Sequence, residues 1–482
     1  RITLKKSLLS VILLIKITIS GAAQESISGV VFLDQNGDGK LNRSEQRLSD
    51  IPLSNGDTIV FTDSRGSFTL PISEDGSFFP ILPSHLSTPK GGVQNFNSSD
   101  YYQTSSGKIR IPLVSREPEK EFRVAAIGDI QVDNIKEFGF AWESIFKELI
   151  DRKDIDFNII LGDLVNDKPT LMPVMKWAID SLSAESWIVI GNHDLDKEKS
   201  FEKYFGAANY AFERGNVCFV SLNNFDHNKS HYTPSQLSFV KNIAERVLKG
   251  KTLVISQHIP LKSVRNRDKL LEIIPDDVNL LILTAHSHVV ERTIWSDNIL
   301  EIGCGAPCGS WWRGNIGADG IPVATMQCGS PRNYFVIDFD EDGSYQAQFK
   351  AIGYDSSYQF NSWSPAGVTP YELVIFDPLL FPDGVVYDCS KGTQSVNIES
   401  EPLGFEELSD SSVIVNLFGG GEDTIILMRR QGEDFEILEK ANLIDLSVSE
   451  IRQDNYESGY RARDSRKIPL RKLPSKHIWK SK

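Results

Sequence analysis

The chain has 482 residues, of which 40% are hydrophobic and 24% are charged. This balance is typical of folded proteins and excludes a wholly disordered chain. The length exceeds that of one ordinary domain, so about two to four domains are expected. A formal net charge of −14 excludes the broad basic field that attracts nucleic acid, so no nucleic-acid partner is expected and anionic ligands must be held locally.

The N-terminal residues predict export. Two lysines precede an apolar run at 8–19, and small residues follow at 20–23. This is the pattern of a signal peptide over residues 1–23. Lys16 interrupts the run, so a short buried or anchoring helix is the alternative. The run is shorter than the ~20 residues of a membrane span. We therefore expect no stable membrane span and a periplasmic, extracellular or cell-surface bacterial protein.

Residues 24–115 predict a small, β-sandwich-like domain. Short β-rich pieces are separated by clusters of Gly, Asn, Asp and Pro. The polar residues 87–106 predict a loop, and residues 115–120 predict a linker. The expected strands are 27–33, 58–62, 67–72 and 108–113.

One segment of this domain fits the EF-hand loop formula at every fixed position. Gly39 allows its sharp turn, but a strand rather than a helix is expected before it. The segment therefore resembles the calcium loops of bacterial surface β-sandwich modules and predicts a structural Ca²⁺ site. An unmetallated Asx-rich turn is the alternative. The expected ligands are side-chain oxygens of Asp34, Asn36, Asp38 and Glu45, the carbonyl of Lys40, and Asn42 directly or through water.

Residues 116–352 alternate apolar strands with amphipathic helices, which predicts an α/β layer domain. In such domains ligands gather at the carboxyl ends of strands. Residues 353–482 return to short β-rich pieces and predict a third, C-terminal β-rich domain. The expected strands are 122–127, 157–161, 187–190, 217–222, 252–256, 280–283, 371–376, 395–398, 412–417 and 424–428, and the expected helices are 138–152, 171–182 and 235–248.

Five short polar motifs lie in the α/β region, most of them directly after apolar runs. They contain four of the chain's eight histidines. Asp, Asn, Gln and His offer oxygen and imidazole ligands, and at strand ends they can converge into a two-metal hydrolytic site. Turn residues that cap strands are the alternative. The motifs are Gly128-Asp129-Ile130-Gln131, Gly162-Asp163-Leu164-Val165-Asn166-Asp167, Gly191-Asn192-His193-Asp194, Gln257-His258 and His286-Ser287-His288.

In order and spacing these motifs match the pattern of the calcineurin-like metallophosphoesterases, and residues 122–354 resemble that superfamily. The resemblance implies a four-layer α/β/β/α domain that hydrolyses phosphomonoesters or phosphodiesters. The flanking regions resemble the N-terminal and C-terminal domains of an exported bacterial subfamily. Relatives continue past the motif at 475–479, so a truncation at Lys482 is expected.

The resemblance also implies two divalent cations (Mn, Fe, Zn or Mg) bridged by Asp163, with a metal-bridging hydroxide as the nucleophile. His193 is expected to contact the substrate as a general acid or oxyanion stabiliser. Asp167 or Asp194 is expected to orient it. The remaining expected ligands are Asp129, Gln131 and His288 for one ion, and Asn192, His258 and His286 for the other.

Gln131 departs from the family pattern, in which a histidine ends the first motif. An amide oxygen is neutral and generally a weaker ligand than imidazole. We expect either oxygen-rich coordination, as for Mn²⁺ or Mg²⁺, or a weakened site. The exported subfamily also carries Gln at this position, which favours an active enzyme. The rival hypothesis is a non-catalytic surface protein that binds glycan or protein and retains a degenerate single-metal site.

The expected substrate is a phosphorylated small molecule, a nucleotide-sugar, a lipid head group or a glycan. Gly-rich residues 303–314 predict a pocket edge, where Arg313 can hold a phosphate oxygen and Trp311 or Trp312 can stack on a sugar or base. Core packing is the alternative for the two tryptophans. The five cysteines show no CxxC pattern, which predicts neither a disulfide scaffold nor a zinc ribbon. Nothing in the sequence predicts the oligomeric state or whether Cys304 pairs with Cys308.

Overall fold

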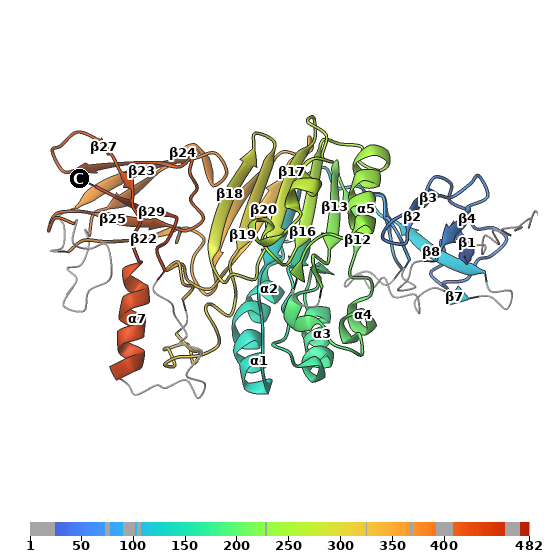
Figure 1. Ribbon diagram of the computed structural model, residues 1–482, viewed down its shortest axis with the longest axis horizontal. Helices are drawn as coiled ribbons and strands as arrows, with labels where there is room; N and C mark the ends of the chain where they lie inside the picture. Colours follow the sequence, from blue (N-terminus) through green and yellow to red (C-terminus); the bar gives the residue numbers. More distant parts are fainter. Residues whose placement is uncertain are drawn as a thin grey trace, which may run out of the picture.

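The computed structural model describes residues 25–72, 78–89, 102–103, 108–226, 229–323, 325–365, 370–391, 408–457 and 473–481. The expected signal peptide and the expected strand at 395–398 lie outside the described residues. A small β region, a central α/β region and a C-terminal β region follow one another along the molecule (Figure 1). No helix in the described part of the chain is long and apolar enough to cross a membrane.

Two sheets form the central region. In spatial order, the first sheet is β11 (Glu185–Ile188), β10 (Phe157–Ile160), β9 (Phe122–Ile127), β20 (Asn333–Phe339) and β21 (Tyr345–Ala351). The second sheet is β12 (Tyr210–Arg214), β13 (Val217–Leu222), β16 (Thr252–Gln257), β17 (Asn279–Thr284), β19 (Ile299–Cys304) and β18 (Val290–Ser296).

Parallel pairing fixes where the polar motifs lie. Strands β9, β10 and β11 run parallel in the first sheet, and β13, β16, β17 and β19 run parallel in the second. Parallel strands bring their carboxyl ends to one edge of a sheet, which is where open α/β sheets bind ligands. Each of the five motifs begins at or just beyond the carboxyl end of β9, β10, β11, β16 or β17.

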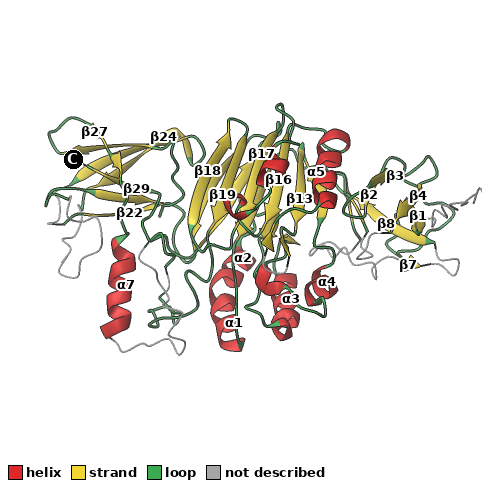
Figure 2. Ribbon diagram, viewed as in Figure 1, coloured by secondary structure: helices red, strands yellow, loops and turns green. Residues whose placement is uncertain are grey.

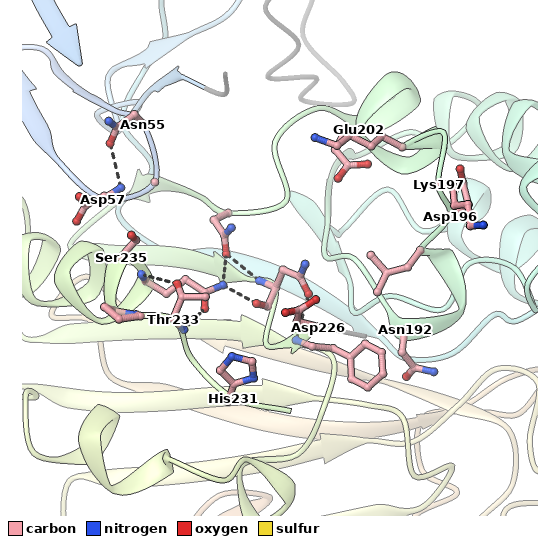
Figure 3. Close-up of a pocket in the computed structure, with 18 of the residues that line it drawn as sticks. Asn55, Asp57, Asn192, Asp196, Lys197, Glu202, Asp226, His231, Thr233 and Ser235 are labelled. Carbon is pink, nitrogen blue, oxygen red and sulfur yellow. Dashed lines mark hydrogen bonds between the residues drawn. The ribbon is translucent and has the colours of Figure 1, made fainter. Parts of the chain in front are cut away.

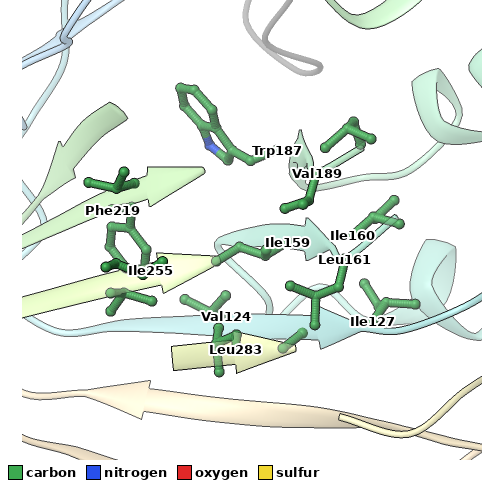
Figure 4. Packing of buried hydrophobic residues seen from close by; sticks show 14 of the residues in the cluster. Val124, Ile127, Ile159, Ile160, Leu161, Trp187, Val189, Phe219, Ile255 and Leu283 are labelled. Carbon is green, nitrogen blue, oxygen red and sulfur yellow. The ribbon is translucent and has the colours of Figure 1, made fainter. Parts of the chain in front are cut away.

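The two sheets pack face to face through branched and aromatic side chains (Figure 4). Phe219 of β13 meets Phe157 of β10 edge to face, with ring centroids 5.3 Å apart. Trp187 of β11 stacks on Phe212 of β12 at 3.5 Å. Burying a large apolar side chain stabilises by roughly 1.5–3 kcal/mol. This interface therefore holds the strand ends of both sheets in a fixed relation.

Helices lie outside the two sheets, most of them grouped below the strands in the view of Figure 2. A crossover between parallel strands must lie on one face of its sheet, and the opposite sheet occupies each inner face. The result is the four-layer α/β/β/α arrangement expected from the sequence. The helices are α1 (Ile135–Ala141), α2 (Lys147–Asp151), α3 (Met172–Asp180), α4 (Ser200–Phe205), α5 (Pro234–Arg246) and α6 (Arg267–Leu271).

The N-terminal region contains a sheet ordered β4-β1-β8-β6, with β7 beside β8, and a three-stranded sheet ordered β3-β2-β5. It contacts the central region through α5, where Arg246 Nη1 donates to the carbonyl of Ile59 at 2.9 Å. Its strands are β1 (Ser26–Leu33), β2 (Pro52–Ser54), β3 (Ile59–Phe61), β4 (Ser67–Pro71), β5 (Phe79–Pro80), β6 (Leu86–Ser87), β7 (Tyr102–Gln103) and β8 (Ile109–Ser115).

The C-terminal region contains two four-stranded antiparallel sheets and the helix α7 (Leu446–Glu457). A buried ion pair joins it to the central region: Arg292 of β18 donates two hydrogen bonds to Asp377, at 2.7 and 2.8 Å. The strands are β22 (Phe360–Trp363), β23 (Tyr371–Asp377), β24 (Phe381–Cys389), β25 (Ile414–Leu417), β26 (Ile425–Arg430), β27 (Glu436–Ile437), β28 (Glu439–Lys440) and β29 (Ile478–Lys480).

The expected fold class is confirmed, because β-rich regions flank a central α/β domain. Strands β9 and β13 match their predicted ranges to the residue. The predicted helix at 138–152 is interrupted by a π-helical turn, Trp142–Phe146, between α1 and α2. The predicted loop at 87–106 is described only in part, and it includes β7. The domain boundaries remain predictions.

Candidate functional site

The backbone is strained where the motifs meet. Seven described residues other than glycine have a positive φ angle, and five of them belong to the motifs. Side chains other than glycine rarely adopt this conformation, which persists only where the surrounding structure holds it in place. Positive φ angles at these positions turn the chain sharply after β9, β10 and β17. The five residues are Gln131, Asp163, Asp167, His286 and His288.

Asp163 lies at the centre of the site, after β10. Its Oδ2 atom is 3.2 Å from Nε2 of His258 and accepts a hydrogen bond from Nε2 of Gln131 at 3.3 Å. Its Oδ1 atom accepts the backbone N–H of His193 at 2.9 Å. A single carboxylate after one strand therefore contacts groups that follow three other strands.

Asp129, after β9, connects the histidines of the second sheet. Its Oδ1 atom lies 3.5 Å from Nε2 of His288 and 3.9 Å from Nε2 of His258. Its Oδ2 atom accepts the backbone N–H of His286 at 2.9 Å. Together with Gln131, Asp129 and His288 form the first expected ligand set, in which Asp129 lies beside His288 and Gln131 donates to Asp163.

Two histidines of the second expected set also lie close to Asp163. Ligand atoms of Asp163, His258 and His286 lie within 4.8 Å of one another. The rings of His258 and His286 are 5.1 Å apart, centroid to centroid. Gly191 brings the third motif against Asp163, because a Cβ atom at Gly191 would lie only 2.1 Å from the backbone nitrogen of Asp163. Asn192 follows Gly191 directly in the chain.

Backbone carbonyls orient the two buried histidines of the site. Nδ1 of His258 lies 2.7 Å from the carbonyl oxygen of Leu161. Nδ1 of His288 lies 2.9 Å from the carbonyl oxygen of Gly309 and 3.0 Å from that of Ser310. An Nδ1–H donated to a carbonyl leaves Nε2 as the ligating nitrogen. The sequence did not predict these carbonyl partners, because a backbone group has no signature in the side-chain pattern.

His193 has one acidic partner in the structure. Its Nδ1 atom lies 2.9 Å from Oδ1 of Asp167. Asp194, the other sequence candidate, is buried and instead accepts the backbone N–H groups of Gly191, Leu164 and Val165 at 2.8–3.2 Å. Asp194 therefore links the loops of the second and third motifs through hydrogen bonds. Asp167 is the residue that contacts the imidazole of His193 and can orient it.

The carboxylates perturb the pKa values of the buried groups. Burial opposes the charged form of His258, but Asp163 and Asp129 outweigh it and raise the pKa of His258 to about 9. Burial and the charge of Asp163 raise the pKa of Asp194 to about 8. Burial, followed by the charge of His258, lowers the pKa of His286 to about 4.

Several buried polar atoms at this point fit a cation better than a closed protein core. Buried polar groups are normally hydrogen-bonded, and an unpaired one destabilises the fold. Here four expected ligand atoms from three of the motifs lack a hydrogen-bond partner, and all four belong to oxygen- or nitrogen-bearing ligand types. They are Asp129 Oδ1, Gln131 Oε1, Asn192 Oδ1 and His258 Nε2. The donor set therefore fits divalent metal.

Comparisons with known proteins agree with this geometry. Residues 122–290 match the family model of calcineurin-like phosphoesterase, and residues 301–482 match the model of the C terminal of calcineurin-like phosphoesterase. The central region is a calcineurin-like phosphoesterase domain. This domain assigns the chain to the metal-dependent phosphoester hydrolases, so the hypothesis of a non-enzymatic surface protein is set aside.

Solved structures of phosphatases share distant similarity with the chain. A dimetal phosphatase from Danio rerio is 11% identical, covering 48% of this chain and 96% of its own, with a TM-score of 0.36. A purple acid phosphatase from yellow lupin seeds is 12% identical, covering 73% of each chain, with a TM-score of 0.40. No curated protein sequence matches the chain.

The two tryptophans near the phosphoesterase site differ in their placement. Trp312 is buried, and its Nε1–H donates to the carbonyl of Ile130 at 2.7 Å, directly beneath the first motif. This favours the packing role over substrate stacking. Trp311 is half-buried with its ring centroid 5.3 Å from that of His288. Arg313 lies over the ring of Trp311 at 5.7 Å, so these two residues border the site.

A large cavity begins at Asn192 and extends to the N-terminal region (Figure 3). Its volume is about 1030 Å³. The sequence did not predict its lining, because residues from Asn55 to Gln236 form it and Asn192 alone among them belongs to a motif. The lining includes Asn55 and Asp57 from the N-terminal region, Lys197 and Lys199 after the third motif, and His231.

The cysteines take no part in a disulfide. All five thiols are free in the structure, so Cys304 and Cys308 do not pair. Cys308 Sγ lies 3.6 Å from Nδ1 of His288, and burial raises the pKa of this thiol. A protonated, buried thiol is a poor nucleophile, which agrees with the expectation that Cys308 is not catalytic.

Proposed function

We propose that this chain binds two divalent cations between its five motifs and hydrolyses phosphoric esters of small molecules. The convergence of unpaired buried ligand atoms around Asp163 carries this proposal. Like charges and lone pairs brought together in a buried site repel each other unless a cation or proton lies between them.

The two halves of the site differ in their ligand chemistry. Asp129, Gln131 and His288 would hold one ion, and Asn192, His258 and His286 the other, with Asp163 shared. The amide oxygen of Gln131 favours a hard ion such as Mn²⁺ or Mg²⁺ in the first half, whereas Fe or Zn also suits the two-histidine half. When bound, such ions supply a nucleophilic water at neutral pH and stabilise charge on the phosphoryl group.

In this proposal His193 acts on the substrate rather than on metal. Its backbone N–H is anchored on Asp163, and Nδ1 is held by Asp167. The ring nitrogen Nε2 is then the atom that donates a proton to the leaving ester oxygen. Trp311 and Arg313 are placed to contact the phosphoryl group or its substituent from the other side of the site.

The cavity beside Asn192 supports a substrate with an organic group of substantial size. Small-molecule sites commonly measure 300–1,000 Å³, and this cavity is about 1030 Å³. Its lining mixes lysines with amides and carboxylates, which suits a polar group better than an acyl chain. We therefore propose a nucleotide-sugar, a lipid head group or a phosphorylated glycan as the substrate class.

The decisive experiment measures metal content and hydrolysis together. Purified protein loaded with Mn²⁺ is expected to hold two ions per chain and to hydrolyse an aryl phosphate ester, and chelated protein is expected to be inactive. The rates on a bis-aryl phosphate and a mono-aryl phosphate then separate a phosphodiesterase from a phosphomonoesterase. Protein that is inactive with every divalent ion contradicts the proposal. If only one ion per chain is found, we infer that the half of the site containing Gln131 is empty.

We also propose that the protein is exported, on the N-terminal pattern alone. Lysines followed by an apolar run and small residues are the features that a signal peptidase system reads. Expression of the chain in a Gram-negative host and sequencing of the mature N-terminus test this proposal. Cleavage after residues 20–23 supports export, and an intact cytoplasmic protein contradicts it.

A further inference from the structure

A second oxygen-rich cluster lies in the N-terminal region, in the loop that follows β1. The loop turns through Gly37 and Gly39, whose φ angles are +73° and +68°. Asp34 shapes it, because its two carboxylate oxygens accept the backbone N–H groups of these glycines at 2.9 Å each. No residue of this loop belongs to the phosphoesterase site.

The loop brings three carboxylates together. Ligand atoms of Asp34, Asp38 and Glu45 lie within 4.8 Å of one another. Oε2 of Glu45 accepts the backbone N–H of Asn42 at 2.8 Å, but Oε1 of Glu45 is buried and has no hydrogen-bond partner. Glu45 is only 8% exposed. A buried carboxylate oxygen without a partner, beside two further carboxylates, requires a positive charge.

We propose that the loop from Asp34 to Glu45 binds one Ca²⁺ ion. The cluster offers hard oxygen ligands only, and the spacing of the acidic residues matches positions 1, 5 and 12 of the EF-hand loop. Asn36 is at position 3, and Lys40 is at position 7, where the ligand is a backbone carbonyl. Ca²⁺ accepts six to eight oxygens with irregular geometry, whereas Mg²⁺ requires a nearly ideal octahedron. A loop with irregularly placed oxygens therefore suits Ca²⁺ better than Mg²⁺.

The position of the loop makes this site structural. Leu33, at the end of β1, donates its backbone N–H to the carbonyl of Gln46 at 2.8 Å, so the loop closes on its own ends. The backbone N–H of Asp34 donates to the carbonyl of Leu113 in β8 at 2.7 Å. Strand β8 then leads directly into the phosphoesterase domain. A cation in the loop therefore fixes the corner where β1, β8 and the chain after Glu45 meet.

Calcium titration of the full chain tests the proposal. Isothermal titration calorimetry of chelator-treated protein is expected to show one Ca²⁺ site with a dissociation constant of about 10⁻⁴ M or tighter. Saturating Ca²⁺ is expected to raise the first unfolding transition by about 5 °C or more. Asp38→Ala is expected to abolish both effects, because Asp38 is exposed and supplies one of the three carboxylates.

Two further variants separate calcium binding from other causes. Asp63→Ala is the matched control, because Asp63 is also an exposed turn carboxylate of the N-terminal region that accepts two backbone N–H groups; it should keep the calcium effects. Asp163→Asn, in the phosphoesterase site, should keep them too. Absence of calcium binding, or equal loss in the Asp38 and Asp63 variants, overturns the proposal, whereas loss in Asp163→Asn alone places the ion in the phosphoesterase site.

Discussion

The two oxygen-rich sites of this protein are built in opposite ways. The phosphoesterase site takes its ligands from five strand ends in two sheets, from Asp129 to His288. The calcium loop takes all of its ligands from the twelve residues between Asp34 and Glu45. The first site exists only once both sheets have packed, whereas the second needs little more than its own turns and the end of β1.

This difference determines how each site is held together. The phosphoesterase site depends on long-range contacts, such as the one between Nδ1 of His258 and the carbonyl oxygen of Leu161 at 2.7 Å. It also contains five strained residues that the surrounding sheets hold in place. The calcium loop instead uses hydrogen bonds between residues two to five positions apart. Damage to the core should therefore disturb the first site far more than the second.

The largest expected effect comes from Asp163→Asn. The carboxylate is central to both halves of the site, and its replacement by a neutral amide removes charge that two cations share. We expect kcat/KM to fall about 10⁴-fold and metal content to fall below two ions per chain, measured by elemental analysis. Asp38→Asn in the calcium loop is the control and should leave kcat/KM within about twofold. Equal losses in both variants would show that the two sites are not independent.

His193→Ala should separate catalysis from metal binding. Loss of a general acid lowers rates by about 10²–10⁴-fold, and metal content should not change, because His193 is not among the expected ligands. Asp167→Asn is expected to cost only about tenfold, because its side chain is 69% exposed and an exposed pair contributes little. Loss of metal from the His193 variant would make this residue a ligand instead.

Two glycine substitutions compare the sites directly. In Gly191→Ala the new Cβ would lie 2.1 Å from the backbone nitrogen of Asp163. The backbone must shift, so we expect a loss of about 1–3 kcal/mol in the free energy of unfolding and about 10²-fold in kcat/KM. In Gly37→Ala nothing lies within 4 Å of the new Cβ, so only the positive φ angle opposes it. Thermal unfolding and kinetics of both variants test this contrast, and an active Gly191 variant would contradict it.

The smallest expected effect is in proton release. The pKa of His258 is raised to about 9 in the metal-free protein, so its ring is protonated at pH 7 and must lose a proton to ligate. The affinity of the phosphoesterase site for the ion that His258 ligates should therefore rise about tenfold per pH unit from pH 7 towards 9. A hydrogen bond from the backbone of Lys40 lowers the pKa of Asp38, so calcium binding should release no proton.

Calorimetry in buffers of different protonation enthalpy measures this difference. Near pH 7 the phosphoesterase site should release one proton from His258 and one from His288, because Cys308 and Asp129 outweigh burial and raise the pKa of His288 well above its ordinary value. His286, with its pKa lowered to about 4, is already neutral. If the heat of metal binding did not depend on the buffer at either site, neither site would release a proton, and the predicted difference between them would be wrong.

Much of the fold was predictable because its signals are local. The ends of the apolar runs coincide with the ends of strands β9 and β13. Amphipathic spacing located α3 and α5. The edge strands β12, β18 and β21 have no counterpart among the predicted elements, because their polar and apolar residues are mixed. The π-helical turn at Trp142–Phe146 was also not predicted. Within it, the ring of Trp142 stacks on that of Trp177, with centroids 4.7 Å apart.

The sequence by itself determined which ligand types the two proposed sites offer, because residue type and order along the chain carry this information. For the calcium loop the sequence also determined which ligands lie close together, since all of them belong to the segment from Asp34 to Glu45. Only the tertiary structure decided that Asp167 rather than Asp194 contacts the ring of His193, and that Trp312 packs beneath the first motif. The first choice depends on the loops that follow the neighbouring strands β10 and β11, and the second on how the two sheets pack together. No local pattern fixes either distance.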